Sequence, residues 1–310
     1  MVERLDAVTS FVDLRHQGRP RAIGTGVLEL DDGIALVDPG PTACLGELRA
    51  RLETLDHALP DVRAILLTHI HLDHATAAGA IIREAPHAIV CVHPRGAEHM
   101  VDPTRLLASA RRLYGDAMDA LWGEFVPVPA AAVRRVDEGD QVTLGRRSLT
   151  VAYTPGHAKH HVAYFEESAG TAWVGDVGGI RIPPGVTVPV TPPPDIDLAA
   201  WNDSMDRVLA WRPHRIVPTH FGPSEDPGRH FEELRAGLAR WAEVVRESLR
   251  GDAGHGPDPA RDASRAKRFA DWLEEDLRSR MPPEHVDAYT GAFGFEDSWW
   301  GLARYWRKRV

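Results

Sequence analysis

The segment THIHLDH, residues 68–74, places three histidines and one aspartate within six positions of the chain. The apolar run 64–67 precedes it, and the small and apolar residues 75–82 behind it are compatible with a helix. This order predicts a buried strand, a loop and then a helix. A loop rich in potential metal ligands is therefore expected directly behind a core strand.

The residue types in this segment suit a metal centre. Imidazole nitrogen and carboxylate oxygen are the usual ligands of a catalytic zinc ion. His69 and His71 project to the same side of an extended segment, so they can share one ion. Asp73 and His74 follow where the chain turns, and they can face a second ion about 3.5–4 Å from the first. The competing interpretation is a loop of solvated side chains, which this spacing disfavours.

The composition of the whole chain limits the classes of function. A chain of 310 residues can bury a full core, as one large domain or as a domain with an appendage. Its hydrophobic fraction of 43% and charged fraction of 26% are ordinary for a globular protein. The net charge of -9 argues against a nucleic-acid surface, which needs clustered Lys and Arg.

The sequence shows no sign of export or of membrane insertion. Residues 1–6, MVERLD, lack a basic region followed by an apolar stretch. No run approaches the length of a membrane span, about 18 apolar residues. Cys44 and Cys91 are too few for a disulfide framework. We therefore expect a cytoplasmic protein that binds a small-molecule substrate, with neither nucleic acid nor membrane as a partner.

Strand patterns fall into two blocks, with helical periodicity between and after them. The first block has expected strands near Val12 and at 26–30, 34–37, 62–67 and 88–92. The second has them at 141–144, 148–153, 162–165, 171–174 and 215–217. Helices are expected at 45–59, 75–85, 196–211, 231–249, 263–280 and 284–289. This α/β pattern fits a four-layer sandwich in which two sheets face each other.

Three more potential ligands follow strands of the second block. His157 ends the string TPGH, residues 154–157. Asp176 comes directly after the strand 171–174, and His220 lies in PTHFG, residues 218–222, behind the strand 215–217. Taken singly, each of these has only a weak claim to bind a metal, because loop histidines and aspartates are common.

Together with THIHLDH, these segments resemble the metallo-β-lactamase superfamily, whose members carry an H-x-H-x-D-H signature on an αβ/βα sandwich. The resemblance covers roughly residues 10–225 and implies two metal sites. It gives His69, His71 and His157 to one ion, Asp73, His74 and His220 to the other, and Asp176 to both as a bridge. An anion between two divalent ions would also reduce their mutual repulsion.

The resemblance implies a dinuclear metal-dependent hydrolase whose nucleophile is a metal-bridging hydroxide. Asp73 would be catalytic as well as a ligand, because it would orient that hydroxide. Zinc is the expected metal, with iron or manganese as alternatives. Several metallo-β-lactamases that cleave antibiotics have Cys or Ser at the position of Asp176, so Asp there favours the other hydrolases of the superfamily.

The expected substrate is a thioester, as in glyoxalase II, with a lactone and then a phosphodiester as alternatives. Two readings come from other classes: a diiron redox protein and a non-catalytic binding module. The flavodiiron proteins resemble H-x-E-x-D-H, whereas this chain has His71 at the Glu position. A binding module with a dead site is disfavoured because no ligand is missing.

Several features have two interpretations at this stage. Asp38, in DPG (38–40), either supports a metal ligand from behind or is a plain turn residue. One of His160 and His161 contacts the substrate or a ligand carboxylate, or neither has a role. Residues 94–129 form a helix-prone insert that serves as a lid or as a dimer contact.

The expected domains are a catalytic domain, 1–250, and a C-terminal helical extension, 251–310, joined by the polar linker 251–262. The extension loosely resembles that of glyoxalase II enzymes. Its Trp299, Trp300 and Trp306 are expected to pack in a core or in a homodimer interface.

Overall fold

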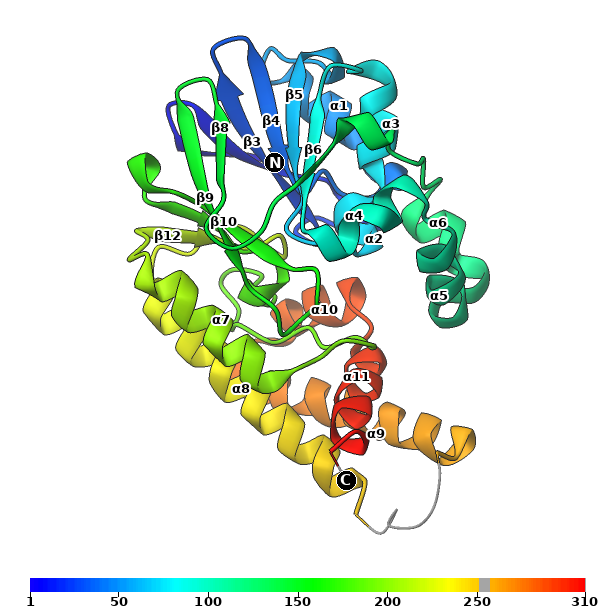
Figure 1. The fold of residues 1–310 in the computed structure, drawn as a ribbon. Coiled ribbons are helices and arrows are strands. Elements are labelled where there is room, and N and C mark those ends of the chain that lie inside the picture. The colour runs from blue at the N-terminus through cyan, green and yellow to red at the C-terminus, as the bar shows by residue number, and fades with distance from the viewer. Residues whose placement is uncertain (251–256, 310) are drawn as a thin grey trace.

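Two β-sheets lie face to face between outer layers of helices in the computed structural model, which describes residues 1–250 and 257–309 (Figure 1). Further helices extend from one end of this sandwich. The α/β four-layer sandwich with C-terminal helices expected from the sequence is confirmed. Within the described residues, no helix has the length and apolar character needed to cross a membrane.

The first sheet contains seven described strands that follow one another in chain order. Its first four strands are antiparallel, and its last four, from β4 to β7, are parallel. The strands are β1 (Val2–Asp6), β2 (Thr9–Asp13), β3 (Gly24–Leu30), β4 (Gly33–Val37), β5 (Val62–Leu66), β6 (Ile89–Val92) and β7 (Val133–Arg135).

Both edge strands of this sheet fall outside the strands expected from the sequence. β1 is half-exposed and carries charged side chains, and two of the three residues of β7 are exposed arginines. Charged, half-exposed edge strands lack the apolar alternation on which a strand prediction depends. Backbone pairing with β2 and β6 defines them instead.

The second sheet contains five described strands, in the order β12-β11-β10-β9-β8. β9 and β11 each run antiparallel to β10, and β12 runs parallel to β11, so β9, β11 and β12 all point the same way. The strands are β8 (Gln141–Leu144), β9 (Arg147–Tyr153), β10 (Val162–Glu166), β11 (Thr171–Trp173) and β12 (Arg215–Val217). Leu66, Val151 and Trp173 belong to the apolar core between the two sheets.

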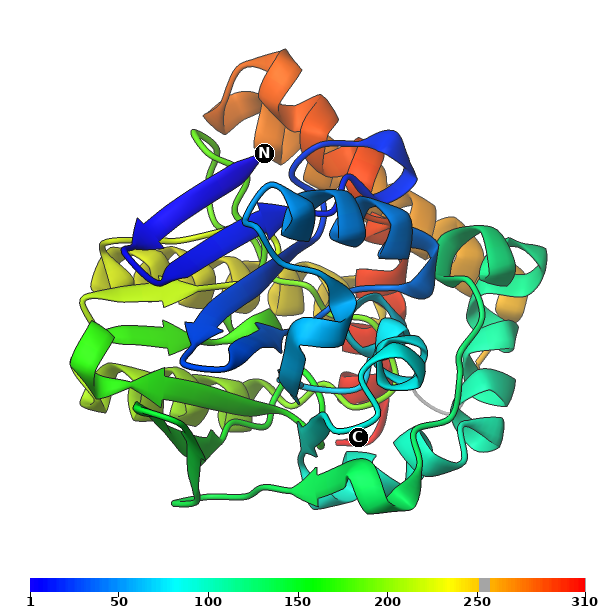
Figure 2. The same cartoon turned by 90° about the horizontal axis from the view of Figure 1, so that it is seen from above.

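Helices cover the outer face of each sheet, as the view from above shows (Figure 2). The first sheet is covered by α1 (Leu45–Glu53), α2 (Leu72–Ala75) and α3 (Ala77–Glu84), and the second by α7 (Leu198–Ala210) and α8 (Pro227–Ser248). The insert contains α4 (Pro94–Val101), α5 (Thr104–Tyr114) and α6 (Met118–Trp122). The chain ends in α9 (Pro259–Arg280), α10 (Pro283–Ala292) and α11 (Phe295–Arg307).

The helix expected over 45–59 is wrong in its length, because α1 ends at Glu53. Asp56 adopts a left-handed conformation, with φ +60°, which an α-helix cannot accommodate. Leu55 and Leu59 are nevertheless buried. The spacing of these apolar residues therefore reflects their burial against the core and does not indicate a continuous helix.

The C-terminal helices pack against α8 through large apolar side chains. Trp241 of α8, Phe269 of α9 and Trp299 of α11 belong to one core cluster, and Trp299 is fully buried. Core packing is therefore the role of the Trp-rich end, while a homodimer stays a prediction. Half of the predicted linker, residues 251–256, lies outside the described residues, and the division into two domains also stays a prediction.

Candidate metal centre

The segment 68–74 adopts the local structure expected from its sequence. β5 ends at Leu66, His71 is extended with ψ 153°, and α2 begins at Leu72. Asp73 and His74 therefore lie in the first turn of a helix, while the two preceding histidines lie on the loop that leads to it. This change of backbone conformation allows neighbouring residues to face two different points.

The other three predicted ligands come from the second sheet. His157 follows β9, Asp176 lies in the 3₁₀ turn Gly175–Gly178 behind β11, and His220 follows β12. Because these three strands point the same way, their carboxyl ends meet at one edge of the sheet. That edge lies against the loop 68–74, so residues up to 151 positions apart in the sequence meet there.

The potential ligand atoms form two groups, and within each group they lie within 4.8 Å of one another. One group contains His69, His71, His157 and Asp176, and the other contains Asp73, His74 and His220. The structure therefore brings together all seven residues that the sequence singled out.

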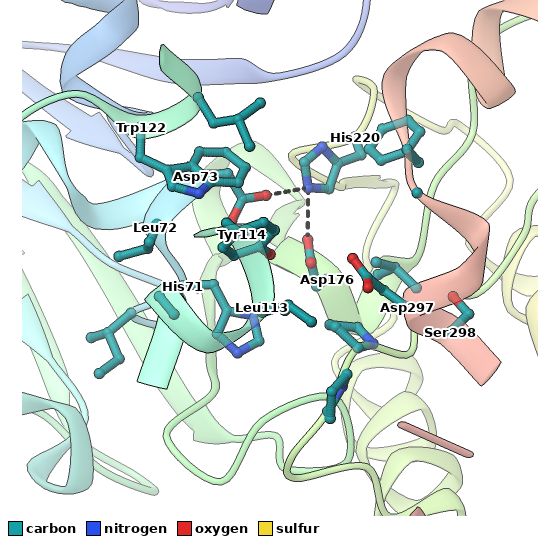
Figure 3. Close-up of a pocket in the computed structure, with 18 of the residues that line it drawn as sticks. His71, Leu72, Asp73, Leu113, Tyr114, Trp122, Asp176, His220, Asp297 and Ser298 are labelled. Atoms are coloured by element: carbon teal, nitrogen blue, oxygen red, sulfur yellow. Dashed lines mark ion pairs between the residues drawn. The ribbon is translucent and has the colours of Figure 1, made fainter. Parts of the chain in front are cut away.

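Asp176 lies between the two groups and offers one oxygen to each. Its Oδ2 is 3.4 Å from Nε2 of His157 and 3.9 Å from Nε2 of His69. Its Oδ1 is 3.2 Å from Nε2 of His74 and 3.4 Å from Nε2 of His220. Figure 3 shows the imidazole of His220 between the carboxylates of Asp73 and Asp176.

The geometry of these atoms fits divalent metal ions. Ligands about 2.0–2.2 Å from a tetrahedral ion are roughly 3.3–3.6 Å apart, which is close to the separations around Asp176. Nε2 of His69, Nε2 of His74 and Oδ1 of Asp176 are buried and have no hydrogen-bond partner. Unpaired buried polar atoms are costly, and a bound cation would satisfy all three.

Hydrogen bonds from behind fix the orientation of four of the histidines. In each, Nδ1 contacts an oxygen atom, so that it holds the proton and Nε2 presents a lone pair to the site. The partners are Thr68 Oγ1 for His69 (3.1 Å), Asp38 Oδ2 for His74 (2.9 Å), the Val190 carbonyl for His157 (2.9 Å) and the Ala22 carbonyl for His220 (2.7 Å). His71 instead presents Nδ1, which lies 2.9 Å from Nε2 of His157.

Asp38 supports the site and is more than a turn residue. Its carboxylate is buried and accepts four hydrogen bonds. Oδ1 accepts one from the Thr68 amide (2.8 Å), while Oδ2 accepts three, from His74 Nδ1 (2.9 Å) and from the hydroxyls of Thr68 (2.7 Å) and Thr219 (2.8 Å). Asp38 thus links the first sheet, the loop 68–74 and the segment behind β12.

Burial and neighbouring charges set the protonation of the ligands. Burial, followed by the charge of His157, lowers the pKa of His71 to about 3, and burial also holds the pKa of His69 well below its usual range. These two side chains are neutral at physiological pH, as metal ligands must be. Burial would lower the pKa of His74 too, but the nearby carboxylates of Asp73 and Asp176 raise it well above the usual value. His74 would therefore release a proton from Nε2 when a metal ion binds.

A cavity of about 560 Å³ opens beside both ligand groups. Asp73, Asp176 and His71 lie on its floor, and the insert and the start of α11 form opposite walls (Figure 3). Trp122 of the insert stacks on His16, with ring centres 5.4 Å apart, and His16 Nε2 lies 2.8 Å from the carbonyl oxygen of Leu121. The insert therefore borders the site as a lid would, while its use as a dimer contact stays a prediction.

The two undecided histidines differ in their positions. His160 lines the cavity, and its Nδ1 accepts a long hydrogen bond from the Ile70 amide (3.4 Å). His161 is fully buried behind His69, with ring centres 5.1 Å apart, and its Nδ1 lies 2.9 Å from Thr154 Oγ1. His160 can therefore touch a substrate, whereas His161 packs behind the ligands.

Sequence reasoning missed Tyr114 and Asp297 as cavity residues. Tyr114 lies in the insert without a motif around it, and Asp297 lies in the first turn of α11, far beyond the last ligand segment. No spacing pattern connects either residue to the motifs, because only the folded chain brings them to the cavity.

Gly156 is the position in the TPGH segment at which a small side chain should do most harm. Its φ is +135°, and a Cβ there would lie 2.3 Å from Cα of the buried Trp201. We expect Gly156→Ala to destabilise the protein by roughly 2–4 kcal/mol, through backbone strain and overpacking, and to lower its metal content by displacing His157. Thermal unfolding and metal analysis measure the two effects.

Gly139→Ala is the matched control for this substitution. Gly139 also has a positive φ, +80°, but nothing lies within 4 Å of an added Cβ. The free energy of unfolding of Gly139→Ala should fall by roughly 1 kcal/mol, and the variant should keep its full metal content. Equal behaviour of the two variants would contradict the proposed constraint at Gly156.

Comparison with known proteins agrees with this geometry. The family model described as "Metallo-beta-lactamase superfamily" matches residues 18–220. The metallo-beta-lactamase fold-containing protein ST1585 of Sulfurisphaera tokodaii is 25% identical over 222 residues, which are 71% of this chain and 80% of that protein.

Two further relatives cover different parts of the chain. A hydroxyacylglutathione hydrolase of Aeromonas hydrophila is 34% identical over 130 residues, which are 42% of this chain and only 37% of that enzyme. The crystal structure of a metallo-beta-lactamase family protein, TTHA1429, from Thermus thermophilus superposes with a TM-score of 0.67 at 22% identity. That match covers 93% of this chain and 89% of the other, so the likeness of fold includes most of the C-terminal helices.

Proposed function

We propose, because this chain belongs to the metallo-beta-lactamase superfamily, that its two ligand groups hold two divalent ions and serve the hydrolysis of a thioester or related ester. Metal-dependent hydrolysis is the activity of that superfamily, and the resemblance noted in the sequence is confirmed at this level. The main support for two metal ions is the position of Asp176, because each of its two carboxylate oxygens faces a different ligand group.

Two divalent ions bound there would lower the pKa of a water molecule toward neutrality and polarise the carbonyl of the substrate. Side chains of this protein would position both the water and the substrate. The Asp73 carboxylate is 22% exposed, against 3% for Asp176, and it borders the cavity. Asp73 can therefore orient the attacking water and hold its proton, while the buried Asp176 serves as a ligand.

Zinc is the proposed metal. The ligand set of five histidines and two aspartates contains no thiolate, and such nitrogen and oxygen donors suit zinc, iron and manganese alike. The four histidines that present Nε2 are held in place by hydrogen bonds from behind, which prepares the site for an ion without large rearrangement.

A thioester is the preferred substrate class for two reasons. One curated relative is a hydroxyacylglutathione hydrolase, and its similarity spans 130 residues of this chain. In addition, the C-terminal region contributes directly to the cavity wall, at Phe293 between α10 and α11 and at Phe295 and Asp297 of α11. A lactone is the second candidate, because the largely apolar wall of the cavity suits a neutral cyclic ester as well.

The test combines metal analysis with hydrolysis assays. Protein purified without chelator should carry about two metal ions per chain and should hydrolyse a simple thioester faster than a lactone or a phosphodiester. Chelation should abolish this activity, and added zinc should restore it. Protein without bound metal, or activity that survives metal removal, would refute the proposal.

A further inference from the structure

One wall of the cavity is an apolar helix face that the rest of the chain covers only in part. Leu106, Ala110 and Leu113 of α5 recur at helical spacing and all line the cavity. No residue of α5 is fully buried. Leu113 is 37% exposed, and among the described residues only Met1 and Val8 are other large apolar side chains with such exposure.

Other apolar side chains complete this surface. Ile23, Trp122 and Phe293 line the same cavity from the N-terminal segment, the insert and the approach to α11. A volume of about 560 Å³ lies within the range of small-molecule sites, roughly 300–1,000 Å³. A partly exposed apolar surface inside such a cavity suits a ligand with an apolar chain.

Apart from the two metal ions proposed above, the charged side chains around the cavity are mostly acidic. Among the described residues that line it, Arg105 is the sole Lys or Arg, and there are four aspartates. Asp73 and Asp176 belong to the ligand groups, and Asp195 pairs with Lys159 at 3.0 Å. The fourth aspartate is Asp297.

Asp297 carries a carboxylate that makes no hydrogen bond or ion pair within the described part of the chain. Burial, with a smaller contribution from Glu296, raises the pKa of Asp297 to about 6. Near pH 7.5 this group is therefore mostly ionised, although its surroundings disfavour the charge. In Figure 3 it lies on the α11 side of the cavity, across from Leu113 and Tyr114.

We propose that the cavity selects uncharged esters with an apolar chain, which lies along Leu106, Ala110 and Leu113, and that the carboxylate of Asp297 rejects anionic substrates. This inference rests on the hydrolase function proposed above and narrows its substrate class. The bond that is cleaved is the ester or thioester bond, and water supplies the hydroxyl of the acid product and the proton of the leaving group.

The first experiment uses metal-loaded wild-type protein and a series of thioesters of mercaptoacetamide with acyl chains from two to eight carbons. kcat/KM should rise about two- to fourfold for each added methylene. The same acyl chains on mercaptoacetate differ by one carboxylate and should be hydrolysed about tenfold more slowly. Chelator-sensitive hydrolysis of the two-carbon thioester reports on the proposed function independently of chain length.

The outcomes separate the two proposals. Chelator-sensitive hydrolysis with no dependence on chain length or charge would overturn the inference and leave the hydrolase intact. Absence of all chelator-sensitive hydrolysis in the series would overturn the thioesterase proposal and the inference with it.

Two pairs of variants locate the selectivity. Leu113→Ser should flatten the rise of kcat/KM with chain length, whereas Arg112→Ser, at an exposed neighbour that does not line the cavity, should keep it. Asp297→Asn should raise the ratio of kcat/KM for the anionic ester to that for the neutral ester about tenfold. Glu296→Gln, at an exposed neighbour outside the cavity, should leave this ratio unchanged.

The ratio of the two esters distinguishes selectivity from a structural effect. A merely structural role of Asp297 would change both esters equally and would leave the ratio at its wild-type value. That result would overturn the assignment of Asp297, and an unchanged chain-length profile in Leu113→Ser would overturn the assignment of the α5 face.

Discussion

Asp176→Ala should lower kcat/KM for the preferred ester by roughly 10³-fold or more and should reduce the metal content below two ions per chain. Each ligand group loses one oxygen in this variant, because Oδ1 and Oδ2 face different groups. Two divalent ions about 3.5–4 Å apart would also lose the anion that reduces their repulsion. Metal analysis and steady-state kinetics on the same preparation measure both effects.

Asp195→Asn provides the control for the loss of a cavity carboxylate. Asp195 also borders the cavity, but it pairs with Lys159 at 3.0 Å and lies outside both ligand groups. Its metal content should equal that of the wild type. If Asp176→Ala kept both ions and most of its activity, a bridging role for Asp176 would be excluded.

Asp38→Asn should destabilise the metal-free protein by about 3–5 kcal/mol and weaken metal binding about 10- to 100-fold. Asparagine tolerates the left-handed backbone at this position, φ +50°, so the change acts through the side chain. Its amide nitrogen must replace one carboxylate oxygen, and both oxygens accept hydrogen bonds, three of them at Oδ2. At least one donor would therefore face another donor.

Urea unfolding of chelated protein measures the stability change, and metal titration measures the affinity. Thr219→Val removes just one of the four donors to Asp38 and should cost about 1 kcal/mol. An unfolding free energy of Asp38→Asn within about 1 kcal/mol of wild type would mean that the buried network contributes less than its geometry implies.

The structure of the ligand segment 68–74 was predictable because residues adjacent in the sequence determine it. Its four donor side chains follow one core strand and enter one helical turn, so neighbouring residues determine where they point. His157, Asp176 and His220 carry no such local signal. Their order relative to THIHLDH matches a known family, and the physical reason for their meeting is the common direction of β9, β11 and β12.

The cavity wall could not be predicted, because it depends on contacts between distant segments. His16 meets the carbonyl of Leu121 across 105 positions of sequence, and Asp297 reaches the cavity only because α11 packs beside it. Residues 94–129 were predicted as a helix-prone insert, but this did not reveal that the apolar face of α5 lines a cavity. The sequence therefore indicates the type of reaction more clearly than the substrate.

The distribution of ligands over the two sheets has a consequence for the stability of the whole protein. Each ligand group draws side chains from both halves of the sandwich, with the loop behind β5 on one side and the ends of β9, β11 or β12 on the other. A bound ion would therefore act as a cross-link between the halves. At a free metal concentration 1,000 times the dissociation constant, one such cross-link adds about 4 kcal/mol to the free energy of unfolding. Cells short of the metal would then lose folded protein along with activity.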